Sequence, residues 1–193
     1  MKTGKIFVYI LLLIGIIILV TQSAYVVNET EQVVITQFGK PVRDAVVEPG
    51  LKFKTPFIQK TNFFEKRYME WDGDPNQVPT RDKKFIFVDT YARWQITDPL
   101  QFFKRLNNER MAQSRLDDIL DGETRDYIAN NNIEEAVRTS NRTPIPSGEI
   151  SELIGDSLAD ISVGRARIQN MIRETANKQA SDLGIQILDF RFK

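Results

Sequence analysis

The chain opens with a long apolar run and then changes to shorter patterns in which apolar and polar residues alternate. No charged residue occurs from position 6 to position 28, a stretch of 23 residues, while about 20 apolar residues cross the hydrocarbon core of a bilayer. Tyr9 and Tyr25 lie toward the two ends of this run, where aromatic rings prefer the membrane interface. The pattern predicts a transmembrane anchor over residues 6–27, preceded by a tail of residues 1–5. The apolar side chains of this anchor include Ile6, Phe7, Leu12, Ile14, Ile17 and Val20.

A cleaved signal peptide is the alternative interpretation of the same run. Gln22 stands where a cleavage site prefers a small residue, and the run is longer than the roughly 7–15 apolar residues of a typical signal core. Both features favour a retained anchor. Lys2 and Lys5 precede the run, whereas Glu29 and Glu31 follow it, so the positive-inside rule places the N-terminus in the cytoplasm and the remaining chain outside.

The first half of the remaining chain has the pattern of strands. Residues 32–38 are rich in β-branched and aromatic residues, and residues 62–71 mix aromatic with charged ones before a cluster of Asp, Gly and Pro. Residues 84–96 form the clearest candidate strand, because apolar positions recur at a period of two. One face of this strand carries Ile86, Val88, Thr90, Ala92, Trp94 and Ile96, and the other carries Phe85, Phe87, Asp89, Tyr91 and Arg93.

The second half has the pattern of helices closed by one strand. Asp98 followed by Pro99 is typical of a helix start, and Leu100, Phe103 and Leu106 follow at helical spacing. A second helix is predicted over residues 109–128 with an inward face, and a third over residues 149–183, interrupted by two glycines. A strand is predicted over residues 185–192. The inward face of the second helix consists of Leu116, Ile119, Leu120 and Ile128, and the two glycines are Gly155 and Gly164.

Composition removes several kinds of chemistry. The chain has 26 basic and 26 acidic residues, and beyond the apolar run 24 basic residues meet 26 acidic ones, a net charge of −2 that offers no basic field for nucleic acid. There is no cysteine and no histidine, which excludes thiolate catalysis, imidazole or thiolate zinc sites and a serine–histidine pair. A serine–lysine pair stays open in principle, but the sequence singles out none. We therefore expect no enzyme activity, no metal and no cofactor.

Two sets of charged residues can be interpreted either as ordinary surface residues or as a binding site. Asp117, Asp118 and Asp121 form an acidic cluster on a predicted helix, which we interpret as a solvated face in preference to a hard-cation site. Arg165 and Arg167 lie at the start of another helical stretch, and we interpret them as surface residues in preference to an anion site.

An aromatic segment around Pro56 is the most informative candidate site. Two interpretations stay open for it: a loop whose aromatic rings dip into the near leaflet while lysines meet headgroups, or phenylalanines that belong to the core of a small sheet. Phe53, Phe57 and Ile58 are the candidate leaflet contacts, and Phe63 and Phe64 are the better candidates for the core. The surrounding lysines are Lys52, Lys54, Lys60 and Lys66.

Several ordered motifs resemble the SPFH family (stomatin, prohibitin, flotillin and HflK/C, or band 7). Residues 28–34, NETEQVV, resemble its opening V-x-E-G-E-x-G-V-V, with departures at Thr30 and Gln32. Residues 37–40, QFGK, and residues 48–58, EPGLKFKTPFI, are similar to its R-F-G-K and P-G-L-H-F-K-x-P-F-I. Residues 88–99, VDTYARWQITDP, and residues 184–193, GIQILDFRFK, complete the set, and the V-D-x-Y-x-x-W-x-I pattern with the short N-terminal tail is most similar to the HflC branch.

This resemblance implies an α+β fold: a transmembrane helix, a β-rich first SPFH subdomain at residues 28–97 and an α/β second subdomain at residues 98–193. It implies a non-enzymatic scaffold in the bacterial inner membrane, with its main domain in the periplasm. Such a scaffold assembles with an HflK-like subunit into a large hetero-oligomer that restrains an FtsH-like membrane AAA protease. A stomatin- or prohibitin-like microdomain organiser and a lipid-binding module are the alternatives, and a hydrolase is a weaker one.

One departure from the family concerns the end of the chain. Family members continue past the closing strand into a long coiled coil, and this sequence stops at Lys193 without a heptad run of useful length. We interpret the chain as either a fragment or a truncated relative, which leaves assembly through such a coil an open expectation.

Overall fold

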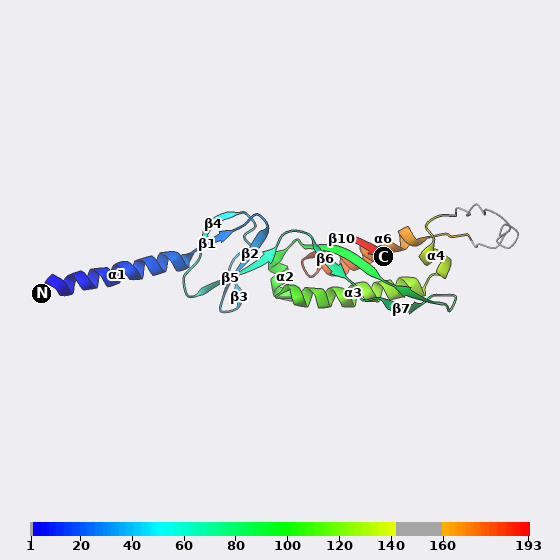
Figure 1. The fold of residues 1–193 in the computed structure, drawn as a ribbon, viewed down its shortest axis with the longest axis horizontal. Helices are drawn as coiled ribbons and strands as arrows, with labels where there is room; N and C mark the ends of the chain where they lie inside the picture. The colour runs from blue at the N-terminus through cyan, green and yellow to red at the C-terminus, as the bar shows by residue number, and fades with distance from the viewer. Residues whose placement is uncertain (1, 142–159) are drawn as a thin grey trace. The chain divides into compact units, whose positions relative to one another are not determined.

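A computed structural model describes residues 2–141 and 160–193, without the side chains of residues 2–5, 7 and 8. The chain divides into two compact units. Unit 1 consists of Met1–Tyr68 and Gln95–Asn108, and unit 2 of Met69–Trp94 and Glu109–Lys193. Figure 1 shows the order of the elements: an N-terminal helix, a run of short strands, a group of helices and a closing strand. Strands and helices are therefore segregated along the chain, and the fold class is α+β as predicted.

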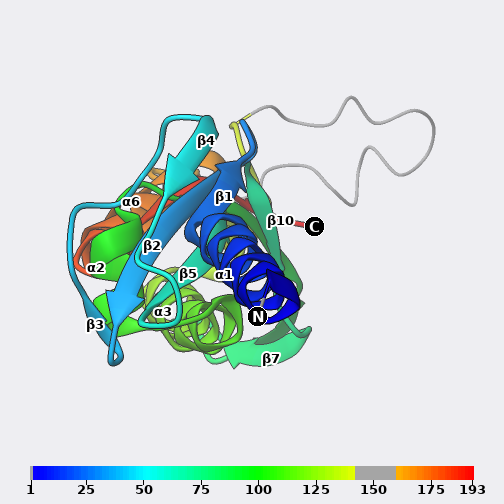
Figure 2. The same ribbon diagram turned by 90° about the vertical axis from the view of Figure 1, so that its left-hand side faces the viewer.

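Unit 1 joins a long helix to small antiparallel sheets. Helix α1 (Lys2–Ser23) continues directly into strand β1 (Ala24–Val27), which pairs antiparallel with β4 (Gly50–Phe53). A second sheet has the order β3-β2-β5, and helix α2 (Pro99–Arg105) packs on β2. Figure 2 views this unit from the α1 end. The strands of the second sheet are β2 (Glu31–Gln37), β3 (Lys40–Pro41) and β5 (Gln59–Glu65).

The core of unit 1 lies between these elements. Phe64 of β5 packs edge-on against the fully buried Phe102 of α2, with 5.2 Å between the ring centroids. Gln32 is also buried, and its side-chain amide donates hydrogen bonds to the carbonyl oxygens of Glu65 and Ile96, which satisfies a polar group inside the core. The remaining core side chains include Tyr25, Val27, Val33, Val34 and Ile35.

In its described residues, unit 2 combines a three-stranded sheet, a hairpin and three helices. The sheet has the order β10-β9-β6, and the hairpin joins β7 to β8 in antiparallel register. Helix α6 (Arg165–Ser181) packs on β10 and against α3 (Glu109–Ala129), while α3 also contacts β7. The strands are β6 (Met69–Asp72), β7 (Asn76–Pro79), β8 (Phe85–Val88), β9 (Thr90–Ile96) and β10 (Ile185–Phe192), and a short helix α4 spans Ile133–Val137.

The two tryptophans anchor the core of unit 2. Trp71 and Trp94 are each about 1% exposed, and each indole N–H finds an acceptor. The indole of Trp71 donates to the Asp117 carboxylate at 2.6 Å, and that of Trp94 donates to the carbonyl oxygen of Glu70 at 3.3 Å. The predicted inward face of α3 is confirmed, since Leu116, Ile119, Leu120 and Ile128 are all buried.

Several predicted element boundaries differ from the structure. The apolar helix ends at Ser23, and residues 24–27, predicted to continue the anchor, form β1 because they pair with β4. The segment 62–71 contains two strands, β5 and β6, and the predicted strand 84–96 is interrupted at Asp89. On its apolar face the residues from Val88 to Ile96 are buried and Ile86 is half-buried, whereas Phe85 and Phe87 on the other face are exposed.

The helical predictions are confirmed in part. Asp98 caps α2, because its carboxylate accepts a 2.9 Å hydrogen bond from the amide of Gln101. The most buried ring of α2 is Phe102, one position before the predicted Phe103. Within the predicted helix 149–183, α6 begins at Arg165, because Gly164 adopts a positive φ of 77° at its N-cap, and residues 160–164 are not helical. Residues 149–159 of that prediction, with Gly155, lie outside the described residues.

Candidate functional site

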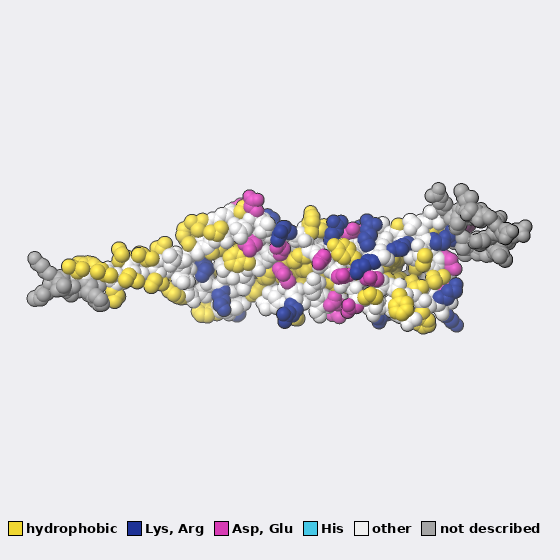
Figure 3. All heavy atoms as spheres, in the orientation of Figure 1, with side chains coloured by type: hydrophobic (Ala, Val, Ile, Leu, Met, Phe, Trp, Pro, Cys, Tyr) yellow, Lys and Arg dark blue, Asp and Glu magenta, His cyan; other side chains and the backbone are white. Residues whose placement is uncertain are grey.

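Helix α1 presents apolar side chains around its whole circumference. From Ile6 to Val20 its large described side chains are 46–71% exposed within the chain, and they include Leu12, Ile14 and Ile17. Figure 3 shows these side chains as a continuous hydrophobic stretch along the helix. A helix that is apolar all round is typical of a buried or membrane-embedded segment.

The predicted anchor residue Phe7 lies on the same helix, but its side chain is outside the described set. Among the residues described by the structure, no helix meets the combined length and hydropathy needed to span a membrane. The transmembrane anchor therefore stays a prediction.

The end of α1 is joined to the aromatic segment by direct hydrogen bonds. The antiparallel register places Ala24, the first residue after the helix, opposite Phe53. The hydroxyl of Ser23 donates to the carbonyl oxygen of Lys54 at 2.7 Å, and the amide of Lys54 donates to the carbonyl oxygen of Ser23 at 2.8 Å. The aromatic segment therefore starts where the apolar helix ends.

Residues 53–58, here called the aromatic loop, have a defined backbone. The amide of Thr55 donates to the side-chain oxygen of Gln59 at 2.8 Å, and the amide of Gln59 donates to the carbonyl oxygen of Thr55 at 3.1 Å. Phe57 has a positive φ of 63°, which is uncommon for a bulky residue. This conformation leaves Phe57 74% exposed, with Phe53 at 60% and Ile58 at 46%.

The structure separates the five apolar residues of this segment into two groups. Phe64 is buried, as its assignment to the core predicted, whereas Phe63 is 43% exposed and contacts Tyr25 edge-on with 6.5 Å between the ring centroids. The reason is the two-residue period of β5, which directs neighbouring side chains to opposite faces. Phe53, Phe57 and Ile58 remain on the surface beside the end of α1.

Basic side chains lie beside β4, where the aromatic loop begins. The guanidinium of Arg43 donates hydrogen bonds of 3.2 Å to the hydroxyl of Tyr25 and to the carbonyl oxygen of Phe53, which ties the end of β4 to the core of unit 1. Lys52 forms a 3.5 Å ion pair with Glu48. An exposed apolar loop flanked by cations has the composition of a surface that meets anionic headgroups.

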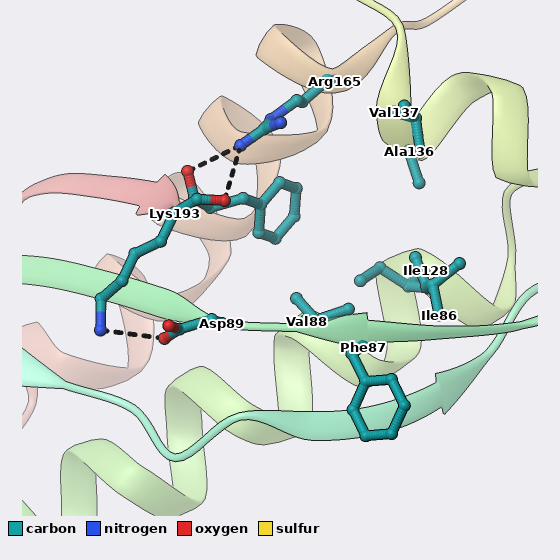
Figure 4. Close-up of a pocket in the computed structure, with 10 residues that line it drawn as sticks. Ile86, Phe87, Val88, Asp89, Ile128, Ala136, Val137, Arg165 and Lys193 are labelled. Atoms are coloured by element: carbon teal, nitrogen blue, oxygen red, sulfur yellow. Dashed lines mark hydrogen bonds and ion pairs between the residues drawn. The ribbon is translucent and has the colours of Figure 1, made fainter.

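Unit 2 contains a separate pocket of about 340 Å³. Figure 4 shows its lining, in which Arg165 approaches the end of β10 and the ammonium of Lys193 lies beside Asp89. The guanidinium of Arg165 donates a 2.7 Å hydrogen bond to the carbonyl oxygen of Phe192, and Lys193 pairs with Asp89 at 2.9 Å. The apolar part of the lining consists of Ile86, Phe87, Val88, Ile128, Ala136, Val137 and Phe192.

The pocket lining contains three ionisable side chains and no hydroxyl nucleophile. Its ionisable side chains are Asp89, Arg165 and Lys193, and none of its lining residues carries a hydroxyl group that one of them could activate. Within the described part of the chain, no group of three or more acidic, histidine or cysteine residues is placed to hold a metal ion.

The charged residues singled out in the sequence have local structural contacts. Asp117 accepts the hydrogen bond from Trp71, and burial, followed by the nearby Asp117 carboxylate, raises the pKa of Asp121. Arg167 is exposed, as predicted, but the prediction of a surface role was wrong for Arg165, which is half-buried against β10. Its contact is with the last residue of β10, the strand that follows α6, and Phe192 lies 27 positions later in the chain, beyond the reach of a local pattern.

An unexpected polar site precedes α6. The Glu135 carboxylate accepts hydrogen bonds of 2.6–2.9 Å from the amides of Ser162, Val163 and Gly164. Burial raises the pKa of Glu135, but these donors outweigh that effect and lower it to about 2. The site is therefore a carboxylate bound to a nest of backbone amides, a contact for which the sequence carries no signal.

Comparisons with known proteins identify the family. Residues 25–193 match the SPFH domain / Band 7 family. Protein HflC of Treponema pallidum is 34% identical over 194 residues, which cover 94% of this chain and 58% of that protein. Protein HflC of Borreliella burgdorferi is 32% identical over 196 residues, which cover 98% of this chain and 60% of that protein.

The name of a third relative states a function. The Escherichia coli (strain K12) protein named Modulator of FtsH protease HflC is 30% identical over 112 residues, which cover 55% of this chain and 34% of that protein. The chain spans 58–60% of the length of the two spirochaete relatives. The match over residues 25–193 confirms the resemblance seen in the motifs: the chain belongs to the SPFH domain / Band 7 family.

Proposed function

We propose that this chain is a non-catalytic scaffold subunit that modulates an FtsH-like membrane protease. One observation carries the proposal: the chain is similar over 94–98% of its length to proteins named HflC, and a further relative of that name is called a modulator of FtsH protease. The proposed role is the one in the name of that relative, carried by the region that the two proteins share.

The proposed location is the bacterial inner membrane, with the N-terminus in the cytoplasm and both units in the periplasm. Two features support α1 as the anchor: the absence of charge from residue 6 to residue 28, and apolar side chains that point outward on all sides of the helix. Lys2 and Lys5 before the helix and Glu29 and Glu31 after it support the orientation.

The aromatic loop is the proposed contact with the near leaflet. Phe53, Phe57 and Ile58 are exposed, and the loop is hydrogen-bonded to the last residue of α1. Each phenylalanine transferred from water to the leaflet contributes about 1.5–3 kcal/mol if it becomes fully buried. Such contacts fix the orientation of unit 1 against the bilayer, whereas a single anchor helix alone does not fix it.

The proposed mechanism is steric. Copies of this chain and of an HflK-like partner, placed side by side around the protease, limit which membrane substrates reach it. At the edge of unit 1, Glu65 and Arg67 pair with each other through two hydrogen bonds of 2.9 Å, while Lys66 between them is exposed.

The test is affinity purification of the full chain from gently solubilised, cross-linked bacterial membranes that contain an FtsH-like protease and an HflK-like protein. We expect both proteins in a large particle, and slower degradation of a membrane substrate when the chain is present. Recovery of the chain alone as a small species, with an unchanged degradation rate, would contradict the proposal. A chain from which α1 is replaced by an unrelated single-span helix separates the contribution of the units from that of the anchor.

A lipid-binding module is the second candidate, and the exposed aromatic loop favours it. If the chain is recovered without the protease, but Phe57→Asp still weakens the association of the chain without α1 with vesicles, the main contact of this chain is lipid. The equally exposed Phe87 of unit 2 provides the matched control, since Phe87→Asp should leave that association unchanged.

A further inference from the structure

A second exposed aromatic residue lies in the turn between β2 and β3. Phe38 is 86% exposed, and it shares a two-residue turn with Gly39. Both residues have positive φ values, 51° and 80°, as in the type I′ turns that favour asparagine, aspartate or glycine at these positions. A phenylalanine here is unfavourable for the backbone and buries little surface within the chain, so folding alone gives no reason for it.

The strand pairing places this turn at the same end of unit 1 as the aromatic loop. Strand β4 runs antiparallel to β1, so Phe53 lies opposite Ala24, the residue that follows α1. The aromatic loop then leads into β5, and the antiparallel register pairs Gln59 at the start of β5 with Gln37 at the end of β2. Phe38 follows Gln37 directly, so the turn and the aromatic loop lie at the same end of the β2–β5 strand pair.

The two aromatic residues share an uncommon backbone conformation. Phe38 and Phe57 are two of the four non-glycine residues with positive φ in the described chain. Each is held out from the sheet by a short connection, the β2–β3 turn in one case and the hydrogen-bonded loop in the other. Strained positions that persist in a structure are found preferentially at binding sites.

Two lysines flank these phenylalanines. Lys40 pairs with Gln37 across the β2–β3 hairpin, and Lys60 pairs with Thr36 across β2 and β5. Both are exposed, and within the described residues neither belongs to an ion pair. Exposed aromatic rings beside unpaired ammonium groups complement a bilayer surface with anionic headgroups.

We propose that the β2–β3 turn is a second membrane contact, in which Phe38 and Phe57 enter the headgroup region of an anionic leaflet as a pair and Lys40 and Lys60 bind its phosphates. The inference rests on the proposed function, because it adds a second point of contact to the leaflet surface of the aromatic loop. The proposed partner of this surface is a bilayer, because the hydrogen bond between Ser23 and Lys54 joins the aromatic loop to the end of an apolar helix. Two separate points of contact, together with α1, define a plane and so fix the tilt of unit 1.

The absence of cysteine makes a direct test possible. Single substitutions Phe38→Cys, Phe57→Cys and Thr30→Cys each receive one environment-sensitive nitrobenzoxadiazole label on the full chain. Thr30 is the matched control, because it is exposed and lies at the other end of β2, whose seven residues extend about 23 Å. The labelled chains are reconstituted in phosphatidylcholine vesicles with and without phosphatidylglycerol, and quenching by doxyl-labelled lipid reports contact with the leaflet.

We expect strong quenching at positions 38 and 57 and little at position 30. Combining Lys40→Glu and Lys60→Glu should lower the quenching at position 38 in anionic vesicles several-fold. Quenching at position 57 without quenching at position 38 overturns this inference and leaves the proposed leaflet contact standing. No quenching at either position overturns both. If the label at position 38 reports an apolar environment without lipid, and this signal increases with chain concentration, position 38 contacts another copy of the chain. This outcome also overturns the inference.

Discussion

The hydroxyl group of Ser23 donates a 2.7 Å hydrogen bond to the carbonyl oxygen of Lys54, and the amide of Lys54 returns a 2.8 Å hydrogen bond to the carbonyl oxygen of Ser23. Ser23 is the last residue of α1, and Lys54 is the first residue after β4. The pair therefore connects the apolar helix to the aromatic loop without an intervening linker. A flexible linker at this position would leave the orientation of the loop independent of the helix.

Loss of the Ser23 hydroxyl should weaken this junction. We expect Ser23→Ala to lower the free energy of unfolding by about 0.5–1.5 kcal/mol, the usual net value of one hydrogen bond. Urea unfolding of the full chain in detergent, followed by circular dichroism, measures the change. Thr21→Ala is the control, because the Thr21 hydroxyl bonds only to carbonyl oxygens of its own helix, at Ile17 and Ile18. Equal losses for both variants would show that Lys54 contributes nothing specific.

Two phenylalanines of unit 1 should respond in opposite ways to truncation. Phe64 is buried against Phe102, so Phe64→Ala should lower the free energy of unfolding by about 3–5 kcal/mol. Phe57 is exposed and has a positive φ, so Phe57→Gly should stay within about 1 kcal/mol of the unmodified chain while it removes a leaflet contact. Urea unfolding gives both values, and a large loss for Phe57→Gly would mean that its ring packs inside the protein.

The two glycines Gly73 and Gly122 should differ in their tolerance of a methyl group. A Cβ at Gly73 would meet the Thr90 hydroxyl and come within 2.6 Å of the Trp71 ring, so Gly73→Ala should destabilise unit 2 by about 1–3 kcal/mol. A Cβ at Gly122 of α3 meets nothing within 4 Å, so Gly122→Ala should stabilise the helix by about 0.5–1 kcal/mol. Tryptophan fluorescence during urea unfolding reports unit 2 directly, and a neutral Gly73→Ala would contradict the packing described here.

The bond between Glu135 and the backbone amides before α6 should make unit 2 sensitive to acid. The ordinary pKa of a glutamate is 4.5, and in the folded chain the pKa of Glu135 is lowered to about 2. A lowered folded-state pKa contributes stability above pH 4.5, and that contribution is lost as the pH falls from 4.5 to about 2. The contribution should be about 1 kcal/mol, because solvent screens a site this close to the surface.

The test compares the free energy of unfolding of the unmodified chain and of Glu135→Gln at pH 7 and near pH 2. We expect a difference at pH 7 that largely disappears in acid. Glu174→Gln is the matched control, since the Glu174 carboxylate is exposed and its ion pair with Arg173 is 3.7 Å long. A difference for Glu135→Gln that does not change with pH would contradict the role of the charged carboxylate.

Local patterns in the sequence were sufficient for most helices and strands. Asp98 and Pro99 start α2, and residues 185–192 form β10, because capping and two-residue alternation act over a few neighbouring positions. The short helix α4 was not predicted. Its N-terminal amide at Ile133 donates a 3.2 Å hydrogen bond to the Asp82 carboxylate, a partner 51 positions earlier in the chain.

The sequence by itself determined the apolar N-terminal helix, the absence of histidine and cysteine chemistry, a strand-rich first half with a helical second half, and the choice of Phe53, Phe57 and Ile58 as surface candidates, because each depends on residue type and short spacing. Only the tertiary structure decided that Phe64 is core and Phe57 is not, and that Phe38 lies at the same edge as the aromatic loop. It also decided that Arg165 binds the end of β10 and Glu135 the amides before α6. The physical reason is that these outcomes depend on strand register and on contacts between distant segments, which no local pattern encodes.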